Sequence, residues 1–273
     1  MKETLYNKLR VKIIKDMRTK TFLGLALCIA GGLTSCNESY LDQTVITDLN
    51  EDVIFADSTY ATGFLTDIYS DIGFDTELDR FNEVGGLQVA CDEAEYKQVS
   101  YITTGASFAT GTVTPITVTN DAWNTCYRRI RACNNFLKNV ERTPMLASTK
   151  KQYKAEARVL RAWYYFLLLR HYGGVPLIGD DIYDVGDEMK STRDTYADCV
   201  NYIDSEIRSV LAENVLRPRT TGRLNGHASE GWCYGILSRL WLYAASPLFN
   251  NNDRFGTPET QYLLNFPTYD KER

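Results

Sequence analysis

The chain has few of the residues that build metal and nucleotide sites. Histidine occurs only at His171 and His227, which fall on different predicted helices, so the sequence has no histidine-based zinc motif. No glycine-rich loop ends in Lys-Ser or Lys-Thr, which excludes a phosphate-binding P-loop. The acidic segment 180–188 could supply oxygen ligands to calcium, but its Gly186 does not fit EF-hand spacing, so a solvated acidic loop is favoured. No cofactor is expected.

Catalytic constellations are also scarce. The segment around Ser107 lacks the second glycine of a nucleophile elbow. Glycosidases need two carboxylates that flank the scissile bond, and the adjacent pairs Asp92-Glu93 and Asp180-Asp181 are the candidates. Sequence neighbours rarely converge on one substrate, and both pairs fall in predicted polar loops. The sequence therefore predicts a binding protein and not an enzyme.

The N-terminal apolar run is too short to cross a membrane. Residues 22–30 supply about half of the roughly 20 residues that a transmembrane helix needs. Basic residues precede the run, and the small residues Thr34 and Ser35 are followed directly by Cys36. This order is typical of a bacterial lipoprotein signal. Cys36 is therefore the predicted lipidation site, where acyl chains such as palmitate would be attached.

The signal divides the chain into three parts. Residues 1–35 are the expected signal peptide, with Met17 as an alternative start, 36–50 are a lipidated tether, and 51–273 are the folded domain. Without the first 36 residues, which hold seven basic and two acidic side chains, 23 basic and 33 acidic residues remain, a net charge of −10. An acidic surface disfavours nucleic acid and anionic lipid as partners. Membrane attachment is therefore expected through the lipid alone.

The folded domain is predicted to be mainly α-helical. Apolar residues recur with helical spacing in the segments 58–72, 121–140, 149–172, 192–213 and 226–249. Within the third segment, residues 162–169 are apolar on every side, which indicates a helix buried all round. Several helices are neighbours joined by short links, as in tetratricopeptide-like helix pairs of an α-solenoid. Residues 73–115 show no clear period and predict a long irregular loop region with few short strands.

The spacing of the cysteines argues against a helical disulfide. Cys126 and Cys133 are seven residues apart, or roughly 10 Å along a helix at 1.5 Å per residue. This separation is too long for a disulfide. Both are expected to be small buried apolar residues.

Five local sequences, taken in order, resemble one family. They are CNESYLD at 36–42, WNTCYRRIRACNNFL at 123–137, the run from AEARVLRAWYY to YGGVPLI at 155–178, GRL at 222–224 and LYAASPLFN at 242–250. In this order the chain resembles the N-terminal half of a SusD/RagB family protein. Members of that family are longer, so the chain resembles a truncated form that is incomplete at its C-terminus. The apolar face around Trp232, Ile236 and Leu240 would then be expected to lack cover.

The resemblance implies a function in polysaccharide utilisation. Members of the family are nutrient-binding lipoproteins of the outer membrane of Bacteroidota. They capture glycans, and sometimes peptides, at the cell surface and deliver them to a SusC-type TonB-dependent transporter without cleaving them. The alternative is a non-catalytic helical-repeat interaction module that binds the transporter and has no ligand site of its own.

The long loop offers the candidate ligand contacts. Sugars stack on aromatic rings while polar side chains bind their hydroxyls. Three loop aromatics and two polar residues fit these roles: Asp92, Tyr96, Tyr101, Phe108 and Asn120. The alternative interpretation is that the aromatics anchor the loop to the helices.

Overall fold

The computed structural model describes most of the predicted helical domain. The described residues are 50–73, 91–94, 110–112, 114, 122–254 and 256–272. The predicted signal peptide and Cys36 lie outside them. Within the described residues there is no strand, and one isolated bridge joins Asn250 and Phe266. The prediction of a mainly α-helical protein is therefore confirmed.

The described part of the chain contains seven α-helices and three short 3-10 turns. The helices are α2 (Glu51–Ala56), α3 (Ser58–Ile68), α5 (Ala122–Asn139), α6 (Ala147–Tyr172), α7 (Tyr196–Ala212), α8 (Glu230–Ala245) and α9 (Gln261–Leu264), and the turns are η2 (Tyr69–Asp71), η4 (Val140–Arg142) and η5 (Gly222–Leu224). None of these helices has the combination of length and hydrophobicity that a membrane crossing requires.

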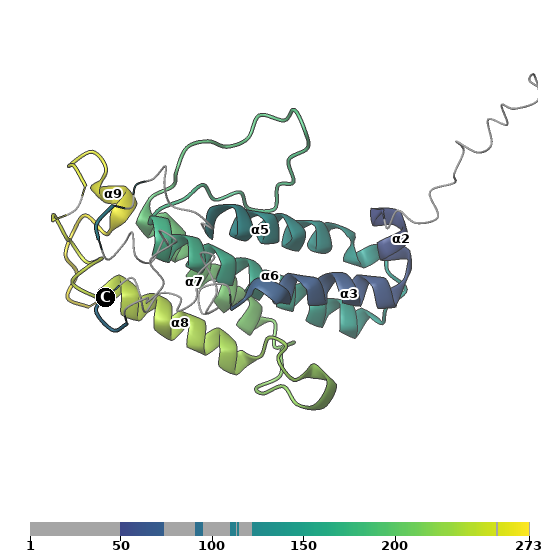
Figure 1. The fold of residues 1–273 in the computed structure, drawn as a ribbon. Coiled ribbons are helices and arrows are strands. Elements are labelled where there is room, and N and C mark those ends of the chain that lie inside the picture. The colour runs from purple at the N-terminus through teal and green to yellow at the C-terminus, as the bar shows by residue number, and fades with distance from the viewer. Residues whose placement is uncertain are drawn as a thin grey trace, which may run out of the picture. The chain divides into compact units, whose positions relative to one another are not determined.

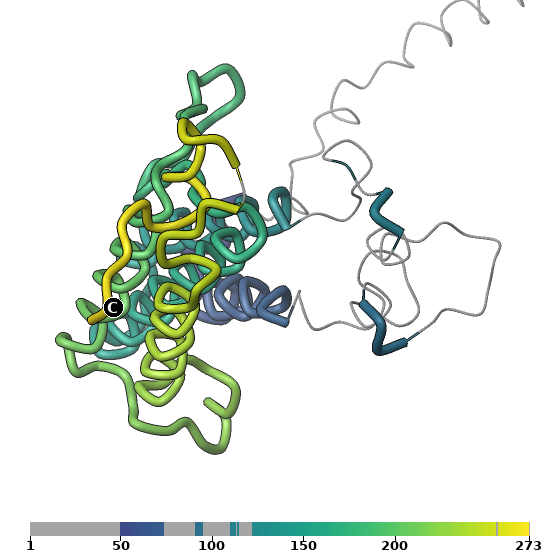
Figure 2. Tube along the Cα trace, turned by 90° about the vertical axis from the view of Figure 1, so that its left-hand side faces the viewer, coloured from purple at the N-terminus to yellow at the C-terminus, as the bar shows by residue number. Residues whose placement is uncertain are grey.

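Consecutive long helices lie side by side and run in alternating directions. Each of α5, α6 and α7 packs against the next helix in the chain, and α3 packs against both α5 and α6 (Figure 1). Two long loops project on opposite sides of these helices: residues 178–195 after α6, and residues 213–229 between α7 and α8 (Figure 2). Helix α6 thus lies in the middle of the packing.

Side-chain caps set where the helices begin. The Asp57 carboxylate accepts from the amides of Thr59 and Tyr60 and starts α3. Thr195 and Asp198 form a reciprocal capping box at the start of α7, four residues after the start that the apolar periodicity predicts. Such caps satisfy amides that have no partner within the helix.

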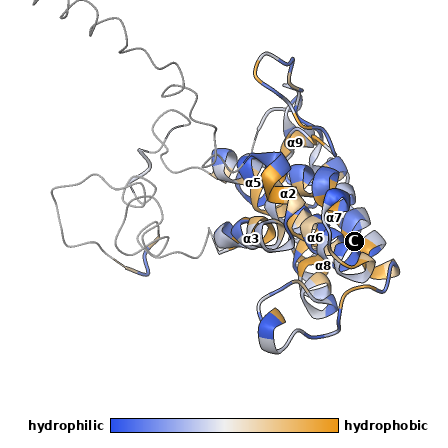
Figure 3. Ribbon diagram, turned by 90° about the vertical axis from the view of Figure 1, so that its right-hand side faces the viewer, coloured by the Kyte–Doolittle hydropathy of each residue, from blue (hydrophilic) through white to orange (hydrophobic). Residues whose placement is uncertain are grey.

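The core follows the pattern that the sequence predicts. Tyr164, Tyr165 and the four residues after them on α6 are buried, which confirms a helix enclosed on all sides. Figure 3 shows hydrophobic colouring along α6 and α8. Cys126 and Cys133 are buried and not in a disulfide, as the spacing predicts.

One expectation about α8 is wrong. The face around Trp232, Ile236 and Leu240 does not lack cover, because Ile236 and Leu240 are buried and the Trp232 ring lies 6.0 Å from that of Trp163. The uncovered apolar residues of α8 are on its other side, where Tyr234 is 60% and Leu242 71% exposed. Helices α6 and α7 cover the first face, and the second faces solvent.

Candidate ligand-binding surface

The structure describes one of the five predicted ligand contacts. Asp92 lies in a turn and is exposed. The other four, Tyr96, Tyr101, Phe108 and Asn120, lie outside the described residues, so their grouping around a ligand stays a prediction.

Two glycines close the base of the 178–195 loop. Gly173 ends α6 with φ of +74°, a left-handed conformation that favours glycine. A Cβ added to Gly174 would lie 2.9 Å from the carbonyl carbon of Thr195. Across the same base, the Asp194 carboxylate accepts from the Leu177 amide at 2.7 Å. The two ends of the loop are therefore held together at the C-terminal end of α6.

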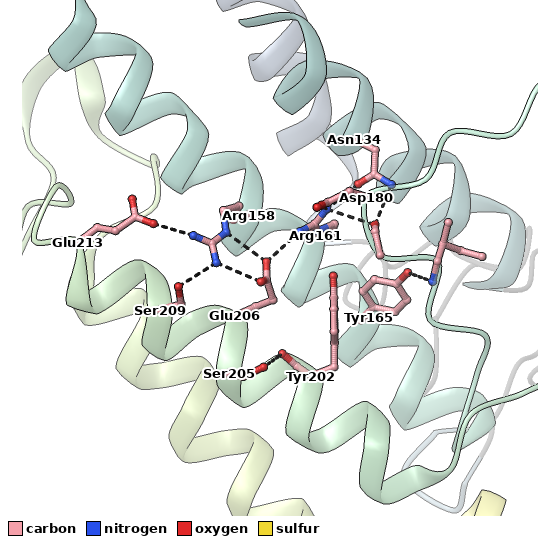
Figure 4. A network of polar contacts seen from close by, with 12 residues as sticks. Asn134, Arg158, Arg161, Tyr165, Asp180, Tyr202, Ser205, Glu206, Ser209 and Glu213 are labelled. Carbon is pink, nitrogen blue, oxygen red and sulfur yellow. Dashed lines mark hydrogen bonds and ion pairs between the residues drawn. The ribbon is translucent and has the colours of Figure 1, made fainter. Parts of the chain in front are cut away.

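A buried arginine on α6 anchors the loop. Arg161 is 4% exposed and forms ion pairs with Asp180 of the loop and Glu206 of α7 (Figure 4). It also donates to the Asn134 side-chain oxygen at 2.8 Å. A buried guanidinium requires such partners, because burying an unpaired charge costs several kcal/mol.

Asn134 on α5 holds the loop through its main chain. Its side-chain amide donates to the carbonyl oxygens of Gly179 at 3.0 Å and Asp181 at 2.8 Å. Arg131, one turn earlier, donates to the carbonyl oxygen of Tyr183. Three successive points of the loop are therefore fixed by side chains of one helix.

Glu206 joins the anchor to a second arginine. Arg158 donates to both carboxylate oxygens of Glu206, at 3.0 and 3.2 Å, and to Glu213 at 2.7 Å (Figure 4). Burial alone would raise the pKa of Glu206, but the hydrogen bonds from Arg158 and Arg161 outweigh burial and lower it below the usual 4.5. Glu206 is therefore a charged structural group.

A groove of about 680 Å³ lies between α5 and the anchored loop. Its volume is within the roughly 300–1,000 Å³ range typical of ligand sites. Aromatic, aliphatic and charged side chains all contribute to its walls. They include Tyr127, Ile130 and Arg131 of α5 and Tyr183, Asp187 and Met189 of the loop. This groove is therefore a candidate ligand site.

A second hollow of about 510 Å³ lies on the surface between α7 and α8. Arg208 and Tyr234 line it, and the Trp241 indole in its wall donates to Asp204 at 2.7 Å. It is a shallower and less varied surface than the groove over α5.

One buried carboxylate on α6 is used structurally. Glu156 is fully buried and binds Tyr69 and His227, each at 2.8 Å, and Gln152 at 2.9 Å. Among the described residues, no three His, Cys, Asp or Glu side chains are grouped so that they could hold a metal ion. Residues 180–188, all of which the structure describes, therefore contain no such cluster of acidic ligands.

Sequence reasoning missed the groove and its anchors. A signal was present, since Asn134 occupies a position on the apolar stripe of α5 and Arg161 lies directly beside the all-apolar run of α6. Polar residues at core positions indicate specific buried partners. The loop partners of Asn134, however, are main-chain carbonyls, which have no sequence signature.

Comparison with known families gives one match. The model of a SusD-like family, described as "Starch-binding associating with outer membrane", matches residues 81–242. A search of curated proteins finds no match.

Solved structures with similar folds share low sequence identity with the chain. BT4246 is 27% identical to this chain with a TM-score of 0.61, and the match covers 78% of this chain and 37% of the BT4246 chain. A laminarin binding SusD-like protein is 21% identical with a TM-score of 0.61, and the match covers 70% of this chain and 41% of that protein. Surface glycan-binding protein A from Bacteroides thetaiotaomicron, in complex with laminarihexaose, is 15% identical with a TM-score of 0.54. The match covers 71% of this chain and 44% of that protein. The chain thus spans less than half the length of these structures.

Proposed function

Because the chain belongs to the SusD-like family, we propose that it captures an oligosaccharide at a bacterial cell surface and delivers it to a SusC-type TonB-dependent transporter. The observation that carries this proposal is the family match over residues 81–242, which includes α5, α6 and α7. The family consists of non-catalytic binding proteins. The chain is accordingly a binding protein in this proposal, and the glycan leaves it unchanged.

Glucose polymers are the first ligands to test. The matched family is described as starch-binding, and two matched structures are described with laminarin or laminarihexaose. Starch and laminarin are both glucans that differ in linkage. We propose Asp92, Tyr96, Tyr101, Phe108 and Asn120 as contacts, with the aromatic rings stacking on sugar faces.

The membrane attachment is a second part of the proposal. Acylation of Cys36 would hold the chain at the outer membrane, with which the family description associates its members. The antiparallel pairs from α5 to α8 would serve as a tetratricopeptide-like platform for the transporter. A mass that includes acyl chains on an N-terminal Cys36 peptide, lost in Cys36→Ala, would support the anchor.

The competing function is a pure interaction module. The packed helices α3 and α5 to α8, which share one buried core, are the kind of surface that such a module would present to the transporter. In that case the chain would bind the transporter and no glycan.

Glycan titration of the purified chain separates the two functions. Isothermal titration with maltohexaose and laminarihexaose should show binding that the double variant Tyr101→Ala/Phe108→Ala weakens. Tyr234→Ala is the matched control, because it removes an exposed tyrosine on α8. Co-purification of the double variant with the transporter should be unchanged. Wild-type protein that binds the transporter but neither hexasaccharide would contradict the proposal for glucans and favour the interaction module.

A further inference from the structure

We propose that the groove between α5 and the 178–189 loop is a second oligosaccharide subsite, built from residues other than the proposed contacts in 92–120. The ligand class rests on the proposed function, whereas the location rests on the geometry of the groove alone. A subsite here would bind a few sugar units against the outer face of α5.

The first argument is that the groove is already formed. The loop wall is fixed at Gly179, Asp181 and Tyr183 by hydrogen bonds from α5 to their carbonyl oxygens. The next turn is closed by the Asp187 carboxylate, which accepts from the Asp184 amide at 2.7 Å. A ligand would therefore not need to order the wall, and this lowers the entropic cost of binding.

The second argument concerns the aliphatic and aromatic side chains that line the groove. Val185 and Met189 line the groove and are exposed. The rings of Tyr127 and Tyr183, also in the lining, are half-buried. Exposed aliphatic and aromatic groups beside one another in a concave surface provide a stacking face for the C–H side of a sugar ring.

The third argument is the charge of the lining. Arg128 and Arg131 line the groove together with Asp181, Asp184 and Asp187, so the positive and negative charges of the lining nearly cancel. A strongly ionic ligand would gain little from this surface. A neutral polyol gains more, because carboxylates accept from its hydroxyls and guanidinium groups donate to them. The groove thus matches the chemistry of a neutral oligosaccharide.

Tyr183→Ala is the variant that tests the subsite. It removes a ring from the groove but keeps the Tyr183 carbonyl that Arg131 binds, so the loop anchor stays in place. Unchanged thermal unfolding and unchanged amide exchange over 178–190 would verify that. The control is again Tyr234→Ala, which removes an exposed tyrosine from the other hollow.

Binding is measured by saturation-transfer NMR and titration with maltohexaose and laminarihexaose, using the full chain. In the Tyr101→Ala/Phe108→Ala background, residual binding should remain, and adding Tyr183→Ala should weaken it by about tenfold, roughly the effect of losing one stacked ring. If the Tyr101→Ala/Phe108→Ala variant binds glycan at full strength and the Tyr183→Ala variant does not bind, the subsite is supported and the loop contacts are refuted.

Three results would overturn the subsite. One is that the Tyr101→Ala/Phe108→Ala variant loses all glycan binding while the separate Tyr183→Ala variant binds glycan as tightly as the wild type. Another is a Tyr183→Ala variant that binds glycan normally but no longer co-purifies with the transporter, which would make the groove a protein contact. The last is a wild-type chain that binds neither hexasaccharide.

Discussion

Replacing Arg161 with methionine should destabilise the fold by about 3 kcal/mol. The variant keeps a long apolar side chain but leaves the buried Asn134 oxygen without its donor, which costs about 1–3 kcal/mol. It also removes one arginine from Glu206, although Arg158 still binds that carboxylate through two hydrogen bonds. Loss of the ion pair with Asp180 adds little to the destabilisation, because the Asp180 side chain is 86% exposed and is hydrated once the pair is broken. The total is within the range for breaking a buried ion pair, about 3–5 kcal/mol, near its lower end.

Urea unfolding followed by circular dichroism measures this loss. Arg208→Met is the matched control, because Arg208 is 62% exposed and forms an i,i+4 pair with Asp204 that should contribute only about 0.3–0.5 kcal/mol. Hydrogen exchange supplies a local readout, with faster exchange expected over residues 178–190 in Arg161→Met alone. Equal losses in the two variants would refute the argument that the buried network stabilises the fold.

Three further changes test other parts of the structure. Gly174→Ala should cost about 1–3 kcal/mol in urea unfolding because its Cβ would overlap the backbone of Asp194 and Thr195 across the base of the loop. Gly235→Ala on α8, with no atom within 4 Å of the added Cβ, should instead stabilise by about 0.5–1 kcal/mol; equal effects would contradict this packing. The lowered pKa of Glu206 means that its stabilisation is complete above pH 4.5 and is lost as pH falls through the folded-state pKa, so Glu206→Gln should flatten the dependence of the urea midpoint on pH in the acid range. Burial raises the pKa of the Cys133 thiol to about 12, so mass spectrometry should find it alkylated by iodoacetamide only in denaturant; modification of native protein would contradict its burial.

Helix existence could be predicted from sequence because it depends on local periodicity. The stripe through Cys126, Ile130 and Cys133 predicts α5, and all three residues are buried. The predicted helix ends were less accurate. The start of α7 is set by the capping box between Thr195 and Asp198, and apolar periodicity does not tell which of several possible capping residues begins a helix.

The exposed side of α8 could not be predicted from sequence. The helix carries apolar residues on two faces, one with Ile236 and Leu240 and one with Tyr234 and Leu242. Periodicity shows that both faces are apolar but not which one a neighbour covers. That choice depends on how α6 and α7 pack, which is a long-range property.

The candidate site shows the same division. The loop aromatics were selected because no helical stripe includes them, and Tyr101 and Phe108 remain predictions. The groove over α5 depends on Asn134 and Arg161 reaching loop atoms 19 to 47 residues away in the sequence. Spacing in the sequence gives no measure of such contacts.

The way the 178–195 loop is held has a consequence for how this surface can diversify. Its anchors on α5 bind main-chain carbonyls at Gly179, Asp181 and Tyr183, and a residue keeps its carbonyl whichever side chain it carries. Mutations at Tyr183, Val185 and Met189 can therefore alter the groove while its scaffold persists. Gene duplicates could diverge in recognition by drift at a few exposed positions, and a randomised library at those positions would sample new specificities on one unchanged frame.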